Sequence, residues 1–429
     1  MAHALSITDG TTTLTLNSTN GYPVESYTPV SPTPAMAMIE PTGVDGGTVS
    51  AADWRQVTDL PMQMGIVGSS KTDLQAKINA LETLLEAARR RQRFHSGPRV
   101  YIQLQLDGEA NTWRSEILAA RLELEADALN LWPSAATEAR LNITRRYFWE
   151  RTTTATAKSS TTITNNASNR LTLDSILGVI PTPAILDIRN NNGAAINFRN
   201  FYIGNDVEHG FTGTEHRVAG GTYSYGAPIT HNNLVLRSDV SKTVADKCAG
   251  GYFHMLGGFS SLPAGIYVKE RLFVYVGVAE LAQLADGPEI VSTGQQLVDF
   301  GVWQIPPGGI SASSGISFYL SAVAGGSGTI TLSFLQLTPA RDFLHLYNRT
   351  YNIPDGGGVV WDGGTQEVYS INAASTARYA TMQHMAGGMN LYPGKSNYLY
   401  VLCDEGSGTY TDTRQLDVTV TYRPRRLTV

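Results

Sequence analysis

The sequence predicts a mainly β protein with one long helix, and three observations support this fold class. Short segments in which apolar and polar residues alternate recur along most of the chain. Only residues 70–93 carry a long apolar repeat at helical spacing. The chain has 42 glycines and only 16% charged residues, below the roughly 25% of typical domains. This composition favours turn-rich β domains and surfaces that are buried in an assembly.

Length and charge narrow the class of protein. The chain has 429 residues, more than one hydrophobic core usually holds, so we expect two to four domains. Its net charge of −5 gives no general attraction to nucleic acid or to anionic membranes. No segment approaches the ~20 apolar residues of a membrane span, and the first residues do not resemble a signal peptide. We therefore expect synthesis in the cytoplasm without membrane insertion.

The segments before the helix predict strands and one irregular arm. Residues 5–16 alternate, with Leu14 and Leu16 on one face, and predict a first strand. Five prolines fall within residues 21–48, and their missing backbone donors favour an extended arm or an edge segment. Residues 54–64 predict another strand.

Residues 70–93 predict the helix around which the N-terminal region is built. Four apolar residues recur at spacings of four, three and four and form one stripe: Leu74, Ile78, Leu81 and Leu85. Ser70 stands at the N-cap position and Asp73 follows three residues later, a variant of the capping box. Basic residues gather at the other end, where the helix dipole favours cations. Ser96-Gly97-Pro98 ends the helix.

Three more strands are predicted between the helix and residue 150. They cover residues 99–106, residues 113–124 and residues 140–150, the last of which reads RLNITRRYFWE. Strands on both sides of a single amphipathic helix indicate an antiparallel sheet packed on that helix. We therefore predict an α+β domain over residues 1–150.

The remaining segments predict further β structure. Ser, Thr and Ala dominate residues 152–164, which indicates a linker or the first edge of a domain. Residues 184–203 predict a hairpin that turns at Asn190-Asn191-Asn192-Gly193. Residues 206–260 show little periodicity, and short alternating segments then follow at the intervals typical of a β-sandwich or jelly roll. The chain ends in a strictly alternating strand at residues 416–423.

The order of these segments resembles the distal tail proteins of long, flexible-tailed bacteriophages. Over residues 1–150 the resemblance rests on the early strand, the proline-rich loop, the capped helix, the strand pair and the closing ITRRYFWE. Residues 161–204 are similar to the opening strands of that family's galectin-like β-sandwich. MNLYPGKSNYLYVL and LDVTVTYRP are similar to the closing pair of the same sandwich.

The resemblance implies a discontinuous domain organisation. It implies an N-terminal ring-forming domain at residues 1–150 and a β-sandwich built from residues 151–205 and 341–429. Residues 206–340 are then an insert, and LPAGIYVKERLFVYV and TITLSFLQL within it resemble jelly-roll carbohydrate-binding modules. About 135 residues suffice for an independent core. We therefore expect the insert to fold alone and the host sandwich to tolerate its replacement by a short linker.

The resemblance also implies a function in assembly. Members of that family form a ring, usually of six copies, that joins the tail tube to the baseplate or tip. The expected partners are other copies of the chain, the tail tube protein and the tail tip or hub proteins, and the expected location is the phage tail. An alternative is a receptor-binding or tail-fibre adhesion protein that binds cell-surface carbohydrate. A weaker alternative is a glycan hydrolase.

Arg89, Arg90, Arg91 and Arg93 are the candidate interface residues. Four arginines near one helix end could contact phosphates. Residues 1–150, however, contain more acidic than basic side chains, which disfavours nucleic acid as the partner. We interpret the arginines as helix-capping and subunit-interface residues.

Aromatic residues of the insert are the candidate carbohydrate-binding residues. A flat apolar ring with a polar edge can stack on a sugar face. The candidates are Tyr223, Tyr225, Trp303 and Tyr319. In any β-sandwich at least half of such rings belong to the core, which is the competing interpretation.

The sequence contains no pattern that predicts catalysis, a metal or a cofactor. Its histidines lack the short spacing of metal ligands, and its Asp-Gly segments lack the acidic series of a calcium loop. Nothing in the spacing of Glu270, Glu280, Glu289 and Asp299 singles out a pair for glycan hydrolysis. We therefore expect a protein without enzyme activity. Cys248 and Cys403 are expected to be buried free thiols.

Overall fold

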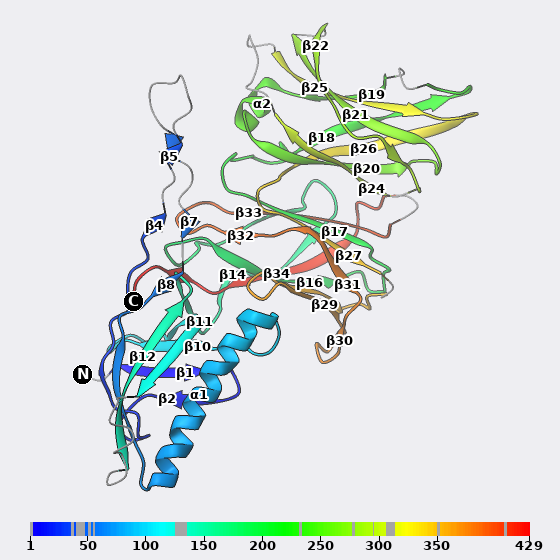
Figure 1. The fold of residues 1–429 in the computed structure, drawn as a ribbon. Coiled ribbons are helices and arrows are strands. Elements are labelled where there is room, and N and C mark those ends of the chain that lie inside the picture. Colours follow the sequence, from blue (N-terminus) through cyan, green and yellow to red (C-terminus); the bar gives the residue numbers. More distant parts are fainter. Residues whose placement is uncertain are drawn as a thin grey trace. The chain divides into compact units, whose positions relative to one another are not determined.

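The protein is mostly β and has two helices among the residues that the structure describes (Figure 1). The computed structural model describes residues 3–35, 38–39, 48–49, 53–54, 56–124, 135–230, 234–276, 279–294, 296–305, 314–349, 352–406 and 410–429. The expectation of a single helix is wrong, because α2 (Lys242–Cys248) is a second one. At seven residues it is too short to produce a helical repeat in the sequence. Neither helix is long and apolar enough to cross a membrane.

The chain folds into two compact units. Unit 1 holds residues 1–155, 177–180 and 423–429, and unit 2 holds residues 156–176 and 181–422. Most of unit 1 is an antiparallel sheet with the strand order β2-β1-β10-β11-β12-β9-β3. Its strands are β1 (Ala4–Thr8), β2 (Thr13–Thr15), β3 (Val24–Ser26), β9 (Met62–Val67), β10 (Tyr101–Gln105), β11 (Trp113–Leu124) and β12 (Ala136–Arg145).

The long helix α1 (Lys71–Phe94) packs on this sheet as the sequence predicts. Its buried residues are Leu74, Ile78, Leu81, Leu84, Leu85 and Ala88, which include the whole predicted stripe. Ser70 caps the helix, since its hydroxyl accepts a hydrogen bond from the Asp73 amide at 3.2 Å. The Asp73 carboxylate accepts from the Ser69 amide at 2.7 Å, one residue before the position that a capping box would use.

The proline-rich arm is an antiparallel hairpin in its described parts. β4 (Pro34–Ala35) pairs with β7 (Asp53–Trp54), and β5 (Met38–Ile39) pairs with β6 (Thr48–Val49). Pro41 lies outside the described residues. The strand predicted over residues 54–64 is three short pieces, because β7 is followed by β8 (Val57–Thr58) and then β9. β8 pairs with β12, so the chain re-enters the sheet directly after the arm.

A buried ion pair fastens the base of the arm to the sheet. Arg145 Nε lies 2.8 Å from Asp59 Oδ2, and neither side chain is exposed. The same Asp59 accepts hydrogen bonds from the Tyr27 hydroxyl at 2.7 Å and the Val30 amide at 2.8 Å. Arg145 Nη2 donates to the Val30 carbonyl at 2.8 Å. Both charges are therefore compensated, and the segment before the arm has a fixed path.

The C-terminal residues belong to unit 1. β35 (Arg425–Arg426) pairs with β13 (Trp149–Arg151), and β13 pairs with β11. The Arg425 guanidinium lies 3.3 Å from Glu150, and its centre is 3.8 Å from the centre of the Phe148 ring. Residues 423–429 are therefore not part of the sandwich to which the sequence assigned them, which is a correction at that boundary.

The described residues of unit 2 form four antiparallel sheets, two from residues on either side of the insert and two from the insert. The outer host sheet has the order β14 (Ala155–Thr164), β34 (Gln415–Tyr422), β16 (Thr182–Asn190), β28 (Gly358–Asp362), β29 (Glu367–Ile371) and β30 (Arg378–Tyr379), with β32 (Asn390–Leu391) paired to β16. The inner host sheet has the order β15 (Arg170–Thr172), β33 (Tyr398–Asp404), β17 (Asn200–Asp206), β27 (Phe343–Asn348) and β31 (Met382–Gly387).

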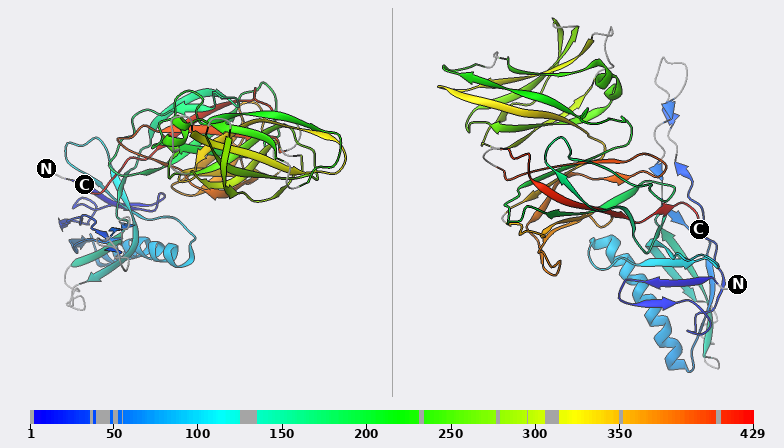
Figure 2. Two further views of the ribbon diagram at one scale, coloured as in Figure 1. Left: turned by 90° about the horizontal axis from the view of Figure 1, so that it is seen from above. Right: turned by 180° about the vertical axis from the view of Figure 1, so that it is seen from behind.

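The insert forms its own two sheets. The inner insert sheet has the order β18 (Arg217–Tyr225), β26 (Gly328–Pro339), β20 (Tyr252–Ser261) and β24 (Leu297–Gln304). The outer insert sheet has the order β19 (Leu234–Val240), β25 (Ser314–Val323), β21 (Tyr267–Val276) and β22 (Ala279–Asp286), with β23 (Ile290–Val291) paired to β21. Figure 2 shows these layers from two further sides. The division of the chain into separately folding domains stays a prediction.

The predicted hairpin at residues 184–203 is wrong. β16 pairs with β34 and β28 in the outer host sheet, whereas β17 pairs with β33 and β27 in the inner one. Gly193 does turn the chain, with φ of 69°, and its amide donates to Asp355 Oδ1 at 2.8 Å. The turn therefore carries the chain from one sheet to the other instead of joining neighbouring strands.

The two inner sheets pack against each other. Their contact contains a hydrophobic cluster whose members come from both: Tyr202, Leu256, Leu297, Phe334, Phe343, Leu402 and Tyr410. Asp404 of the host is buried there and accepts a hydrogen bond from the Leu297 amide of the insert at 3.1 Å. Burial raises the pKa of Asp404 to about 6. The insert therefore covers part of the host sheet instead of being joined to it only by its connecting segments.

Both cysteines are buried free thiols, as predicted. Burial raises the pKa of the Cys248 thiol to about 12, and the Cys403 thiol is shifted in the same direction. The thiolate forms that react with oxidants or bind metals are therefore disfavoured.

Candidate interaction surfaces

Two of the four candidate interface arginines are held by their own chain through Glu86 and the neighbouring sheet. Arg89 donates from Nε and Nη2 to the Ala120 carbonyl, at 3.2 and 2.9 Å. Arg90 Nε lies 3.3 Å from Glu86, one turn earlier on α1. Both side chains are still more than half exposed, so charge remains available at the surface.

The other two arginines lie at the very end of α1. Arg91 Nη1 donates to the His95 and Gly97 carbonyls, at 3.3 and 3.1 Å. His95 has a left-handed conformation with φ of 53° and ends the helix. The Arg93 guanidinium lies 5.2 Å from the centre of the Phe94 ring. Arg91 therefore caps the helix, which is the role that the sequence predicts for part of this cluster.

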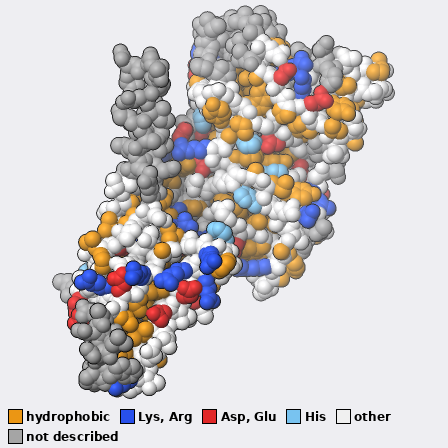
Figure 3. All heavy atoms as spheres, in the orientation of Figure 1, with side chains coloured by type: hydrophobic (Ala, Val, Ile, Leu, Met, Phe, Trp, Pro, Cys, Tyr) orange, Lys and Arg blue, Asp and Glu red, His pale blue; other side chains and the backbone are white. Residues whose placement is uncertain are grey.

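A groove of about 840 Å³ lies beside α1 in unit 1. Glu86, Arg89, Arg90 and Phe94 line it from the helix side, and Leu122 of β11 lines the opposite wall. The Phe94 ring is 61% exposed. Figure 3 shows basic and acidic side chains next to one another on this unit. An exposed aromatic ring among arginines is a composition that is enriched in protein interfaces. We call this feature the α1 groove.

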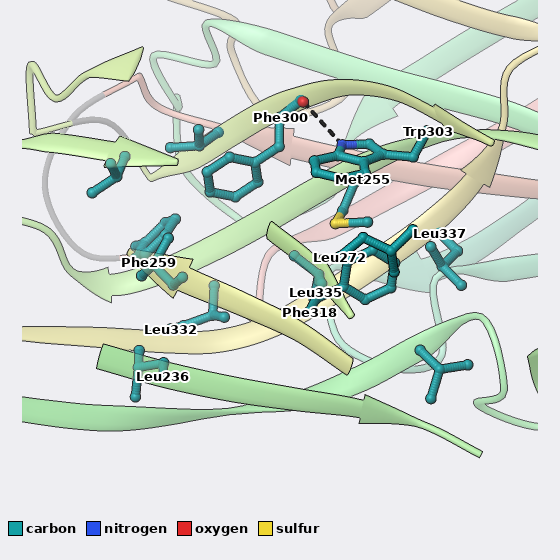
Figure 4. Close-up of a cluster of buried hydrophobic side chains, with 14 of the residues drawn as sticks. Leu236, Met255, Phe259, Leu272, Phe300, Trp303, Phe318, Leu332, Leu335 and Leu337 are labelled. Atoms are coloured by element: carbon teal, nitrogen blue, oxygen red, sulfur yellow. Dashed lines mark hydrogen bonds between the residues drawn. The ribbon is translucent and has the colours of Figure 1, made fainter. Parts of the chain in front are cut away.

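Two of the four candidate carbohydrate-binding residues lie in the core of the insert. Tyr225 is 7% exposed and Trp303 is 4% exposed, and both belong to the cluster between the two insert sheets. Figure 4 shows Trp303 packed among Met255, Leu272 and Phe300. Its Nε1 donates to the Phe300 carbonyl at 3.1 Å. Neither ring presents a free face for stacking on a sugar.

The other two candidates are half-buried and lie in different sheets. Tyr223 on β18 is stacked on Tyr225, with ring centres 6.3 Å apart. Tyr319 on β25 meets Phe273 edge-on at 5.1 Å, and Arg237 lies 5.7 Å from its ring centre. The four aromatic residues therefore do not form one platform.

Two histidines of unit 2 each lie next to an aspartate, and a third is buried. His209 Nδ1 lies 2.9 Å from Asp206, and His254 Nδ1 lies 3.1 Å from Asp299. Burial lowers the pKa of His216 to about 3, so this residue is neutral at physiological pH. His231 lies outside the described residues. Among the residues that are described, no three His, Cys, Asp or Glu side chains form a group that could hold a metal ion.

A pocket of about 560 Å³ at the contact between the inner host sheet and the insert was missed by sequence analysis. Its walls include Tyr202 and Tyr347 from the host and Asp299 from the insert. Tyr202 lies 97 positions before Asp299, and Asp299 lies 48 positions before Tyr347, so no local pattern connects them. The only partial signal was Asp299, which the sequence offered as one of four unpaired carboxylates.

Comparison with known proteins finds likeness in solved structures only. No family model matches the chain, and no curated protein matches it. The crystal structure of the SPP1 Dit (gp 19.1) protein aligns over 99% of both chains, with 10% identity and a TM-score of 0.38. Two structures of the phage p2 baseplate in its activated conformation, with Ca and with Sr, align with TM-scores of 0.31 and 0.32. Their identities are 8% over all of both chains and 7% over 98% of both chains.

Proposed function

We propose that this chain is a structural component of a phage tail, and specifically the distal tail protein at the junction between tail tube and tip or baseplate. The observation that carries the proposal is the order of elements in unit 1. An early strand, a proline-rich arm, a capped helix on one sheet face and a closing strand at Trp149–Arg151 follow one another as the sequence resemblance implies. The proposed role is assembly rather than catalysis.

In this proposal unit 1 forms a closed ring, most simply of six copies. The α1 groove supplies one half of the contact between neighbouring copies, because it combines the exposed Phe94 ring with Arg89 and Arg90. When one surface of each copy contacts a different surface of the next copy, the copies form a closed ring if the rotation between neighbours leads back to the first copy. The hairpin arm supplies main-chain hydrogen-bonding edges that a neighbouring copy, the tail tube protein or a hub protein can cover.

Negative-stain electron microscopy of the purified protein tests this role. We expect rings with six-fold symmetry and a central channel, together with a matching mass in light scattering. Phe94→Ala and Arg90→Ala should shift the population towards monomers, whereas Arg121→Ala, at an exposed position on β11 outside the groove, should not. A strict monomer at high protein concentration would overturn the proposal.

Glycan binding by the insert is the second part of the proposed function. Tyr223 and Tyr319 are the candidate residues that keep part of their rings at the surface. A glycan array with the full-length protein tests this part separately from ring formation. Glycan binding without any rings would favour the alternative, a receptor-binding or tail-fibre adhesion protein.

A further inference from the structure

The inner host sheet has one face that the insert covers only in part. On this face Asn200, Tyr202 and Gly204 of β17 lie opposite Tyr347, His345 and Phe343 of β27. At the Gly204 end the insert touches the sheet, since a Cβ atom built there would overlap Thr338 Cγ2. At the Asn200 end the two sheets leave the pocket of about 560 Å³ between them. We call it the junction pocket.

Two tyrosines give the junction pocket its aromatic surface. Tyr347 is half-buried, and among the described residues its ring stacks on no other and its hydroxyl makes no hydrogen bond. Tyr202 is held in place by stacking on His345, with ring centres 4.3 Å apart. Its hydroxyl also lacks a hydrogen-bond partner within the described part of the chain. The pocket thus offers the half-buried Tyr347 ring and two hydroxyl groups that make no hydrogen bond among the described residues.

Charged side chains around the tyrosines keep part of their hydrogen-bonding capacity unused. Arg349 is exposed, and its guanidinium has no ion pair within the described ranges. Arg414 donates twice to Oε1 of Glu405, which leaves Oε2 free to accept another bond. Asp299 on the opposite wall is fixed by His254 and by the Gly301 amide at 2.9 Å. Donors and acceptors therefore line the same pocket as the Tyr347 ring.

We propose that the junction pocket binds a neutral hexopyranose unit of a glycan. A pyranose has an apolar C–H face for the Tyr347 ring and hydroxyl groups that both donate and accept, which suits Arg349 together with Glu405. Basic and acidic side chains both line the pocket, so it has no strong preference for a charged ligand. The volume lies in the range of small-molecule sites. The proposal rests on the glycan-binding part of the proposed function. It places glycan binding in a pocket that the host and the insert form together, instead of in the insert alone.

Because both walls are required, ligand binding and insert docking are coupled. A sugar that contacts Tyr347 on the host and Asp299 on the insert favours the docked arrangement over any separated one. The same coupling means that neither the host nor the insert alone should bind the sugar with full affinity.

Saturation-transfer NMR and calorimetry on the full chain test the proposal. The probes are the methyl glycosides of glucose, galactose and N-acetylglucosamine at millimolar concentration. We expect at least one to bind, and we expect Tyr347→Ala to weaken its Kd by about tenfold or more. Tyr347→Phe should weaken it less, because the ring remains. Tyr252→Ala is the matched control, since Tyr252 is 56% exposed on β20 and does not line the pocket.

Two results would overturn the junction-pocket proposal. One is that none of the three glycosides binds the folded full-length protein. The other is that Tyr347→Ala and Arg349→Ala both leave the Kd of a bound glycoside within about twofold of the unchanged chain. Either result leaves ring formation to be judged by microscopy, so failure of the sugar site and failure of the tail role are distinguishable.

Discussion

Arg145 and Asp59 show how a single ion pair can decide the stability of unit 1. Neither side chain is exposed, so removing one partner leaves the other charge buried without compensation. We expect Arg145→Ala to lower the free energy of unfolding by about 3–5 kcal/mol. Urea denaturation followed by tryptophan fluorescence measures the change. Arg121→Ala is the control, because Arg121 is 75% exposed in its pair with Glu123, and its effect should stay below about 1 kcal/mol. Equal shifts for the two variants would contradict this interpretation.

Glu270 is a second buried acidic side chain, and it lies in unit 2. It is 1% exposed on β21, and neither carboxylate oxygen has a hydrogen bond among the described residues. Burial raises its pKa from 4.5 to about 8. Between these values the unfolded chain releases the proton that the folded chain keeps. Stability from this group is therefore complete below about pH 4.5 and declines as the pH rises to about 8.

Glu270→Gln tests this pH dependence. The amide has nearly the same shape and does not ionise, so we expect a higher Tm than that of the unchanged chain near pH 8.5 and a much smaller difference near pH 4.5. Differential scanning calorimetry at the two pH values measures it. Glu367→Gln changes an exposed carboxylate and should show no such divergence. A Tm difference that is the same at both pH values would show that Glu270 does not titrate in this way.

At the scale of an element, α1 is the clearest case for a mutation. Leu81 is fully buried against the sheet of unit 1. Leu81→Ala removes that contact and leaves a cavity, so we expect a loss of about 2–5 kcal/mol in the free energy of unfolding. Glu82→Ala, next to it on the exposed side, should cost well under 1 kcal/mol. Comparable losses in urea titrations of both variants would mean that the buried side has been misplaced.

Elements with one buried face could be predicted from the sequence together with the face that they bury. For elements buried on both faces, only the presence of the element could be predicted. α1 and β34 each keep a solvent side, so their apolar residues recur at the period of a helix or a strand. In β17 six of seven residues are buried, and in β33 the same proportion holds, because these strands contact a sheet on each side. Their apolar runs show that a strand is present but not which sheets cover it.

For the candidate sites, features that depend on the local sequence could be predicted, and features that depend on contacts between distant segments could not. The arginines at the end of α1 could be identified because helix-end charge is a local property. The exposure of Phe94 and the opposite wall at Leu122 depend on how α1 lies on β11. The junction pocket depends on three segments near residues 200, 299 and 347, which meet through the pairing of β17 with β27 and the packing of the inner insert sheet on the inner host sheet. The burial of Trp303 could not be predicted, because an aromatic residue in a sandwich strand has the same local pattern on either face.

At the scale of the whole molecule, a single substitution at Gly204 can test the contact between the host sandwich and the insert. A methyl group at Gly204 would overlap Thr338 Cγ2. We expect Gly204→Ala to reduce the free energy of unfolding of unit 2 by about 1–3 kcal/mol, as overpacking does. Urea denaturation measures the loss.

A second substitution should reverse this loss. Thr338→Ser removes the overlapping methyl group and keeps the hydroxyl that accepts from Gln336 at 3.2 Å. The double variant should therefore be about as stable as Thr338→Ser alone. Gly226→Ala is a suitable control, since nothing lies within 4 Å of the added atom. If the double variant is no more stable than Gly204→Ala, the close approach is not what limits this position.

The pairing of β35 with β13 joins two segments that are far apart in the chain. β35 completes the sheet of unit 1, and unit 2 lies between it and β13 in the sequence. Trp113 and Phe148 therefore gain their contacts with Arg426 and Arg425 only when the chain returns from unit 2 to unit 1. We expect a variant that ends after Tyr422 to keep a cooperative unfolding transition from unit 2 and to lose ring formation in electron micrographs. Unchanged rings would contradict this expectation; lost rings would mean that unit 1 becomes competent for assembly only once β35 is paired.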